Sequence, residues 1–128
     1  MNSIEIKCND QKTLKSTEGS WGSWTMFKYC PNGAYLSGFQ LKSQPSPGIE
    51  CNSNNTCDKV GATDINMKCN DGTVLTGNSV VNWGTWGKWI ECPPLYYICG
   101  IKTKVYPSCG SYCDDYSLTK VSFICCVP

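Results

Sequence analysis

The chain has 128 residues, 41% of them hydrophobic, and its 11 lysines balance 10 acidic residues to leave a net charge of +1. This length predicts one domain over residues 1–128, and the even charge gives no basic surface for nucleic acid. His and Arg are absent, which excludes His-dependent triads, His metal ligands and Arg clamps on phosphate.

Similar five-residue segments mark the ends of three units along the chain. The first, residues 4–8, reads Ile-Glu-Ile-Lys-Cys; it recurs as 65–69 and, in part, as 121–125. We expect each segment to be a strand that ends one repeat. The chain then holds the tail strand of a preceding repeat, 4–8, followed by two whole repeats, about 9–69 and 70–126.

Four sequence features recur between the two whole repeats at an offset of 62 residues. They are a Trp-Gly-x-Trp segment, a Cys-Pro pair, a glycine and a proline: Trp21–Trp24 with Trp83–Trp86, Cys30 with Cys92, Gly38 with Gly100, and Pro45 with Pro107. Beyond the prolines the offset falls to 56, which relates Cys57 to Cys113 and Cys69 to Cys125. The first repeat therefore has a longer loop between Pro45 and Cys57.

Apolar and polar residues alternate in the strands predicted within each repeat. Residues 39–42 read Phe-Gln-Leu-Lys, and a similar alternation covers 101–105 and 121–125. A period of two is typical of half-buried antiparallel strands, and clusters of Gly, Pro, Asn and Asp predict the turns between them. No stretch has helical periodicity, so we expect an all-β protein. Gly38 and Gly100 fall within strands, where glycine marks a bulge or a close backbone approach.

Eleven cysteines are scattered along the chain rather than gathered into paired Cys-x-x-Cys clusters. This pattern favours a disulfide framework in an oxidising compartment over a metal site. We therefore expect a secreted, extracellular protein with no metal and no cofactor. The Asn54-Asn55-Thr56 sequon agrees with that location and makes Asn54 a candidate for glycosylation. No apolar run is long enough to span a membrane.

The relation between the repeats also predicts disulfide pairs. In chain order they are Cys30–Cys69, Cys51–Cys57, Cys92–Cys125, Cys99–Cys126 and Cys109–Cys113. The crossed pairs Cys92–Cys126 and Cys99–Cys125 are the alternative that the sequence leaves open. Cys8 matches Cys69 and Cys125, whose partners lie upstream, so we expect its partner in a preceding repeat; a free buried thiol or an intermolecular bridge is the alternative.

The repeated motifs resemble those of the vitelline membrane outer layer protein 1 family. The similarity rests on Ser20–Trp24, on Cys30-Pro31-Asn32-Gly33 with the strand that follows, on Trp83–Trp89, and on Cys125-Cys126 near the C-terminus. It covers almost the whole chain. The resemblance implies a type I β-prism, in which four-stranded Greek-key sheets form three walls around a shared core.

The chain resembles the second and third repeats of that family and the last strand of the first. About two of the three walls are therefore expected in this chain. Two sheets alone would leave apolar inner faces uncovered, which soluble monomers rarely tolerate. We expect either that a missing N-terminal repeat belongs to a longer chain, or that a second chain completes the prism.

Aromatic residues are the first candidates for ligand contacts, because a flat ring can stack on the C–H face of a sugar. Tryptophans at a spacing of three with glycine between them also suit the corner of a sheet, so we expect most of them to fill the core. Trp89, Tyr96 and Tyr97 break the repeat symmetry and are predicted as ligand-binding residues.

Carboxylates are the second group of candidates, because glycoside chemistry needs an acid and a second carboxylate within about 10 Å. Asp58, Asp114, Asp115, Glu50 and Glu91 form the available set. The aspartates follow cysteines in predicted turns, where an Asx turn is the simpler role. We assign Asp58, Asp114 and Asp115 as candidate ligand contacts and name no catalytic residue.

Three functions are compatible with these features. The first is a secreted, disulfide-rich structural protein of an egg coat, mucus or matrix that associates with extracellular glycans or glycoproteins. The second is a lectin-like carbohydrate-binding module. The third, implied by the resemblance, is a glycosyltransferase that acts on N-acetylchito-oligosaccharides; an enzyme is the disfavoured reading because no catalytic set is visible.

Overall fold

The computed structural model describes residues 3–16, 23–43, 61–77, 84–105 and 118–127, and this part of the chain contains strands and turns but no helix. Its nine strands are, in chain order, β1 (Glu5–Lys7), β2 (Thr13–Lys15), β3 (Leu36–Ser43), β4 (Ala62–Cys69), β5 (Val74–Thr76), β6 (Thr85–Trp86), β7 (Ile90–Glu91), β8 (Tyr97–Val105) and β9 (Leu118–Cys126). The prediction of an all-β protein is confirmed.

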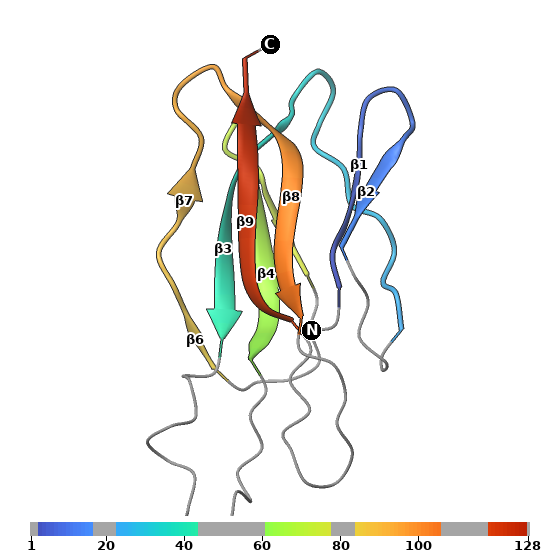
Figure 1. Ribbon diagram of the computed structural model, residues 1–128. Helices are drawn as coiled ribbons and strands as arrows, with labels where there is room; N and C mark the ends of the chain where they lie inside the picture. Colours follow the sequence, from blue (N-terminus) through green and yellow to red (C-terminus); the bar gives the residue numbers. More distant parts are fainter. Residues whose placement is uncertain (1–2, 17–22, 44–60, 78–83, 106–117, 128) are drawn as a thin grey trace, which may run out of the picture.

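The described strands pair into three antiparallel sheets. In the largest, β4 lies between β5 and β3, and both β6 and β7 pair with the other edge of β3. The β1–β2 and β8–β9 pairs form separate hairpins. Figure 1 shows the β8–β9 hairpin in front of β3 and β4, with the β1–β2 hairpin at the side of these two layers.

Side chains from all three sheets meet in one core. Phe39 on β3 and Phe123 on β9 pack edge to face, with ring centroids 4.7 Å apart, a geometry that the ring quadrupole favours. Ile4, which precedes β1, is 8% exposed and belongs to the same cluster as Phe39, Ile65 and Leu118. The alternation predicted from the sequence therefore points one face of each long strand inward.

The β3–β4 and β8–β9 hairpins have the same register under the offsets of 62 and 56. The equivalent facing pairs at the two ends are Leu36–Cys69 with Ile98–Cys125, and Ser43–Ala62 with Val105–Leu118. Both hairpins also have register shifts at the same two places, one of them immediately before Gly38 or Gly100. A slip of one residue in the strand pairing would turn every side chain to the opposite face of the sheet. The shared register therefore means that equivalent residues of the two hairpins face the same way.

The β1–β2 hairpin repeats the β4–β5 hairpin in the same way, 61 residues earlier. In both turns an aspartate, Asp10 or Asp71, accepts a 3.0 Å hydrogen bond from the backbone N–H two residues later. The next residue is Gln11 with φ 72° in one turn and Gly72 with φ 93° in the other. The two turns therefore share a conformation that suits glycine better than glutamine.

Three disulfides join the described strands and the segments before them. They are Cys30–Cys69, Cys92–Cys125 and Cys99–Cys126. Of the two pairings that the sequence leaves open near the C-terminus, the structure contains the uncrossed one. Cys8 is half-buried and free. The predicted pairs Cys51–Cys57 and Cys109–Cys113 lie outside the described residues.

Candidate functional site

Gly38 lies in β3 between two charged residues on the neighbouring strands. Its partners are Lys68 on β4 and Glu91 on β7. Gly38 has no side chain, so the Lys68 ammonium reaches across β3 to the Glu91 carboxylate, with 2.9 Å between Nζ and Oε1. Lys68 Nζ also lies 4.4 Å from the centre of the Trp89 ring, within the range of a cation–π interaction. One lysine thus connects both edges of β3.

A second set of contacts crosses β3 nearer to β6. The Asn66 amide donates to Gln40 Oε1 at 3.3 Å, and the Gln40 amide donates to the backbone carbonyl of Gly87 at 2.9 Å. Two residues further along β3, Lys42 Nζ lies 5.8 Å from the centre of the Trp86 ring. Each described tryptophan beside β3 therefore has a lysine ammonium near one face of its ring.

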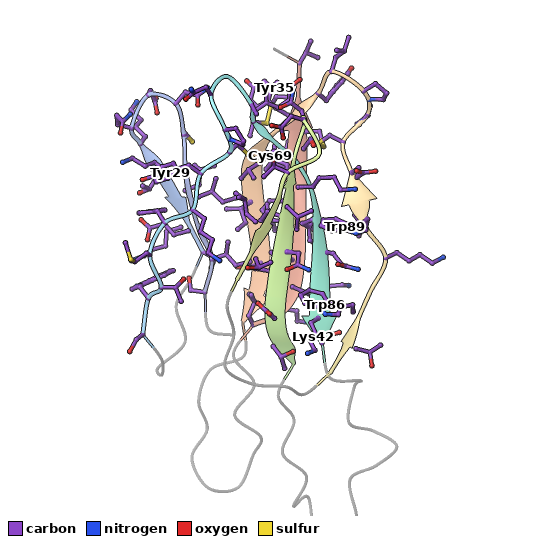
Figure 2. All side chains as sticks on the ribbon, turned by 180° about the vertical axis from the view of Figure 1, so that it is seen from behind. Tyr29, Tyr35, Lys42, Cys69, Trp86 and Trp89 are labelled. Atoms are coloured by element: carbon purple, nitrogen blue, oxygen red, sulfur yellow. A yellow bond between two sulfur atoms is a disulfide. The ribbon has the colours of Figure 1, made fainter. Side chains whose placement is uncertain are left out.

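These side chains lie on the outer face of the five-stranded sheet. Gln40 and Lys42 alternate with Phe39, which points into the core, and Figure 2 shows Trp86 and Trp89 along the same edge of β3, with Lys42 close to Trp86. We call this surface the tryptophan face; it comprises Gln40, Lys42, Lys68, Trp86, Trp89 and Glu91. It combines two flat apolar rings with an amide, two ammonium groups and a carboxylate.

The tryptophan face has the chemistry of a surface that binds polar, ring-shaped ligands. An indole ring can stack on the C–H face of a sugar, and amide, ammonium and carboxylate groups can bind its hydroxyls. The ammonium groups of Lys42 and Lys68 occupy one side of the two rings. A stacked ligand would therefore use the other side of each ring or displace a lysine.

The structure places Trp89 on this face, but it separates Tyr97 from it; Tyr96, which is 36% exposed, precedes Tyr97 in the chain. Tyr97 packs edge to face on Tyr35, with ring centroids 5.9 Å apart, and Figure 2 shows Tyr35 beyond Cys69, at the opposite end of the sheet from Trp86. Tyr35 and Tyr97 are also equivalent at the offset of 62. The interpretation that Tyr97 breaks the repeat symmetry is therefore wrong.

The expectation that the tryptophans fill the core is also wrong for those that the structure describes. Trp24 is 52% exposed, and Trp86 and Trp89 are half-buried. The inward positions of the sheet are taken by residues such as Phe39 and Ile65, so the indole rings lie on its outer side. Trp21 and Trp83 are outside the described residues.

Several candidate residues cannot be placed on this surface. Glu50, Asn54, Asp58, Asp114 and Asp115 all lie outside the described residues. Of the carboxylates considered, Glu91 is described, and it is paired with Lys68. Gln40, Lys42 and Lys68 were not predicted as site residues from the sequence. The mid-strand glycine Gly38 was the available signal for this surface, because such a glycine marks where neighbouring strands approach closely.

The described part of the chain contains no group of three or more His, Cys, Asp or Glu side chains that could hold a metal ion. Nor does it contain a helix long and apolar enough to cross a membrane.

Comparisons with known proteins point to one family. The sequence model described as Vitelline membrane outer layer protein I (VOMI) matches residues 1–128. Two curated relatives, each named vitelline membrane outer layer protein 1 homolog, are 33% identical (Mus musculus) and 29% identical (Homo sapiens) over 98% of this chain. The chain spans 61% and 60% of their respective lengths. It therefore belongs to the vitelline membrane outer layer protein I family.

Proposed function

We propose that this chain is part of a secreted structural protein of an extracellular layer and that it associates with glycans through the tryptophan face. The observation that carries the proposal is the pair of indole rings, Trp86 and Trp89, fixed beside β3 by cross-strand contacts of Lys42 and Lys68. Side chains fixed before binding lose little entropy when a ligand docks. The name of the two relatives, which refers to the outer layer of the vitelline membrane, supports the extracellular setting.

The disulfides support secretion and a structural role. Three disulfides lie within the described residues alone, and such bridges persist in oxidising compartments outside the cytosol. Each joins segments separated by 27 to 39 residues, so each constrains the unfolded chain. A protein stapled in this way suits a layer that must persist without renewal.

The proposed architecture is a type I β-prism made of repeats that end at Cys8, Cys69 and Cys125. Three observations support it: three antiparallel sheets share one core, the β3–β4 and β8–β9 hairpins agree in register, and β1–β2 agrees with β4–β5. In this arrangement each wall presents an outer face to the surroundings. The tryptophan face is the outer face of the wall that contains β3.

The test is glycan binding by variants of the tryptophan face. The wild-type chain is screened on a glycan array that includes N-acetylchito-oligosaccharides, and the best ligand is titrated by tryptophan fluorescence. Trp89→Ala and Trp86→Ala should each weaken binding about tenfold, equivalent to about 1.4 kcal/mol. Trp24→Ala is the matched control, because Trp24 is equivalent to Trp86 at the offset of 62 but contacts Lys15 instead.

Two outcomes would contradict this function. Binding that survives the double variant Trp86→Ala/Trp89→Ala would place the glycan site elsewhere, and the absence of any glycan ligand would remove association with glycans. Incubation with chito-oligosaccharides provides a separate check. Longer or shorter products would show that the chain is an enzyme rather than a structural protein.

A further inference from the structure

The outer face of the β8–β9 hairpin carries three lysines close together. Lys102 and Lys104 lie two residues apart on β8, and Lys120 on β9 faces Lys104 across the pair. All three are exposed, whereas Ile101, next to Lys102, packs against the core. Figure 1 shows this hairpin in front of β3 and β4, so the face that carries the lysines points away from those strands. We call this surface the lysine face; it comprises Lys102, Lys104, Lys120 and Ser122, which faces Lys102.

No carboxylate of these two strands balances the lysine face. Neither β8 nor β9 contains an aspartate or a glutamate, and no ion pair joins Lys102 or Lys120 to another described residue. Side chains that face each other across an antiparallel pair have Cβ atoms about 5 Å apart, and like charges at that distance destabilise the sheet. The lysine face is therefore a local concentration of positive charge in a chain whose net charge is only +1.

The equivalent face of the β3–β4 hairpin shows that the fold does not require these lysines. Under the offset of 56, Lys120 corresponds to Asp64, which faces Lys42, so opposite charges lie where the lysine face has like charges. Under the offset of 62, Lys102 corresponds to Gln40. Because the two hairpins share register and register shifts, the same backbone accepts an acid or an amide at these positions. The lysines therefore distinguish the β8–β9 face and need an explanation other than folding.

A surface of this kind attracts a partner with several negative charges close together. Two lysine side chains face each other across the pair, and Lys102 lies about 7 Å further along the sheet, the length of two strand residues. A lysine ammonium binds sulfate or phosphate oxygens as a compact point charge. The Ser122 hydroxyl, opposite Lys102, can donate a hydrogen bond to a sugar hydroxyl or accept one from it. Closely spaced ammonium groups beside a hydroxyl suit a sulfated sugar chain.

Two other anionic partners fit the lysine face less well. Electrostatic binding to a phospholipid surface uses clusters of about 4–8 lysines or arginines, and this face has three lysines. An acidic peptide is disordered when it is free, so it loses much of its conformational entropy when it docks. A chain of sugar rings has fewer rotatable bonds for its length and loses less. The charge and the geometry therefore favour a polysaccharide.

We propose that the lysine face binds a sulfated polysaccharide of the extracellular layer. The proposal rests on the extracellular setting given under the proposed function, but it does not rest on glycan binding by the tryptophan face. The two surfaces belong to different sheets and have no residue in common. Each can therefore be removed by substitution while the other is kept.

The experiment measures the binding of a fluorescently labelled heparin hexasaccharide by anisotropy. The comparison probes are the same hexasaccharide without its sulfate groups, which keeps its carboxylates, and the neutral N-acetylchitohexaose. The titrations are run at about 50 mM and about 200 mM salt, because ion pairs with a polyanion weaken as salt rises. Competition by vesicles that contain phosphatidylserine and by a polyglutamate peptide tests the two other kinds of partner.

The variants follow the differences between the two hairpins. Lys120→Asp restores the charge pattern of the β3–β4 face and should weaken binding of the sulfated probe at least about tenfold, because it adds a negative charge opposite Lys104. Lys102→Gln should weaken it about threefold. In both variants the slope of log affinity against log salt should fall by roughly 1 or more. Lys12→Gln, which removes an exposed lysine from the β1–β2 turn, is the matched control and should bind within about twofold of wild type.

Thermal unfolding separates lost binding from lost folding. Lys120→Asp should have the Tm of the wild type or a higher one, because opposite charges replace like charges across the strand pair. The double variant Trp86→Ala/Trp89→Ala should keep its affinity for the sulfated probe even if it loses its affinity for neutral glycans. Failure of the lysine face is thereby distinguished from failure of the tryptophan face.

Four results would overturn the proposal. Absence of binding to the sulfated probe at the lower salt concentration would remove the site, and wild-type affinity in Lys120→Asp would place it elsewhere. Equal affinity for the sulfated and desulfated probes would mean that sulfate is not recognised. Tighter binding to the vesicles or to the peptide would identify a different class of partner.

Discussion

Among the residues that the structure describes, two other than glycine have a left-handed backbone, and both occupy places where an equivalent turn has glycine. Gln11 (φ 72°) corresponds to Gly72 (φ 93°), and Leu95 (φ 73°) corresponds to Gly33 (φ 77°). A side chain in this conformation brings Cβ close to the backbone and costs about 1–2 kcal/mol. Leu95 is also 79% exposed, so packing does not offset that cost.

Gln11→Gly and Leu95→Gly should each raise the free energy of unfolding by about 0.5–1 kcal/mol, since relief of strain exceeds the extra entropy of glycine in the unfolded chain. Chemical denaturation monitored by tryptophan fluorescence measures the change. Gly72→Ala and Gly33→Ala are the reciprocal controls and should destabilise by a similar amount. A lower stability for both glycine variants would show that the two side chains make contacts worth more than the strain.

The Asp71 turn predicts a small dependence of stability on pH. The Thr73 backbone N–H donates to the Asp71 carboxylate and holds its pKa below the usual value, because the bond favours the charged form. This contribution to stability is present above the pKa of an unfolded aspartate and is lost as pH falls through the lower folded value. NMR titration of the Asp71 carboxyl should give a pKa below that of an unstructured peptide; an equal or higher value would contradict the turn's role.

Residue roles were predicted well where they follow from local chain geometry and poorly where they depend on neighbouring strands. Gly38 is read from its place within a strand, and the structure shows both the bulge and the close approach. Lys68 gave no local signal, because its partners Glu91 and Trp89 lie more than 20 residues away. Tyr97 is equivalent to Tyr35, so the repeat itself indicates a packing role for this ring.

At the scale of elements, the two mid-strand glycines should differ in how much they tolerate a side chain. A Cβ at Gly38 would lie 3.0 Å from the Ile90 carbonyl oxygen, which is backbone of the adjacent strand. At Gly100 it would lie 3.1 Å from Cδ1 and 3.2 Å from Cβ of Ile124, with no backbone atom among the three nearest. Ile124 is 59% exposed, so its Cδ1 can rotate outward, while its Cβ must shift slightly. Gly38→Ala therefore requires the backbone of a neighbouring strand to move away, whereas Gly100→Ala requires a side-chain rotation and a small shift of Ile124.

Gly38→Ala should lower the free energy of unfolding by about 1–3 kcal/mol, the usual cost of overpacking, and Gly100→Ala should lower it by less. Denaturant titration of both variants provides the comparison. Hydrogen exchange of the Cys92 amide, which bonds to the Ser37 carbonyl beside Gly38, should be faster in Gly38→Ala alone. Equal losses of stability in the two variants would contradict the assigned difference.

The long strands could be predicted from the sequence, but the pairing of the short ones could not. Alternation is visible over β3, β8 and β9 because each long strand has one face in the core. β6 and β7 have two residues each, too few for a period to be recognised. Their pairing with β3 of the preceding repeat is also hidden, since an internal offset shows which residues are equivalent and not which are in contact.

At the scale of the whole molecule, stability should depend on the disulfides. In the chain-entropy model, a bridge that closes a loop such as Cys30–Cys69 contributes about 4 kcal/mol. A strong reductant should therefore lower the Tm substantially and make the folded chain sensitive to protease. Cys8→Ser is the control and should unfold at the Tm of the oxidised wild type, because it removes a thiol that forms no bridge in the structure. An unchanged Tm after full reduction would contradict this account.

The order of strands in the five-stranded sheet has a consequence for biosynthesis. The inner strands, β3 and β4, are complete at Cys69, but the flanking strands β5, β6 and β7 all come later in the chain. On a ribosome, the β4 edge of this sheet stays bare until β5 has left the exit tunnel, and the β3 edge stays bare until residue 91 has left it. Bare edges recruit other chains. A nascent chain that stalls in this interval therefore exposes unpaired backbone N–H and C=O groups as well as an unfinished core. One unit cannot be excised as an autonomous module, and the fold can gain or lose a unit only if its neighbours still exchange their flanking strands.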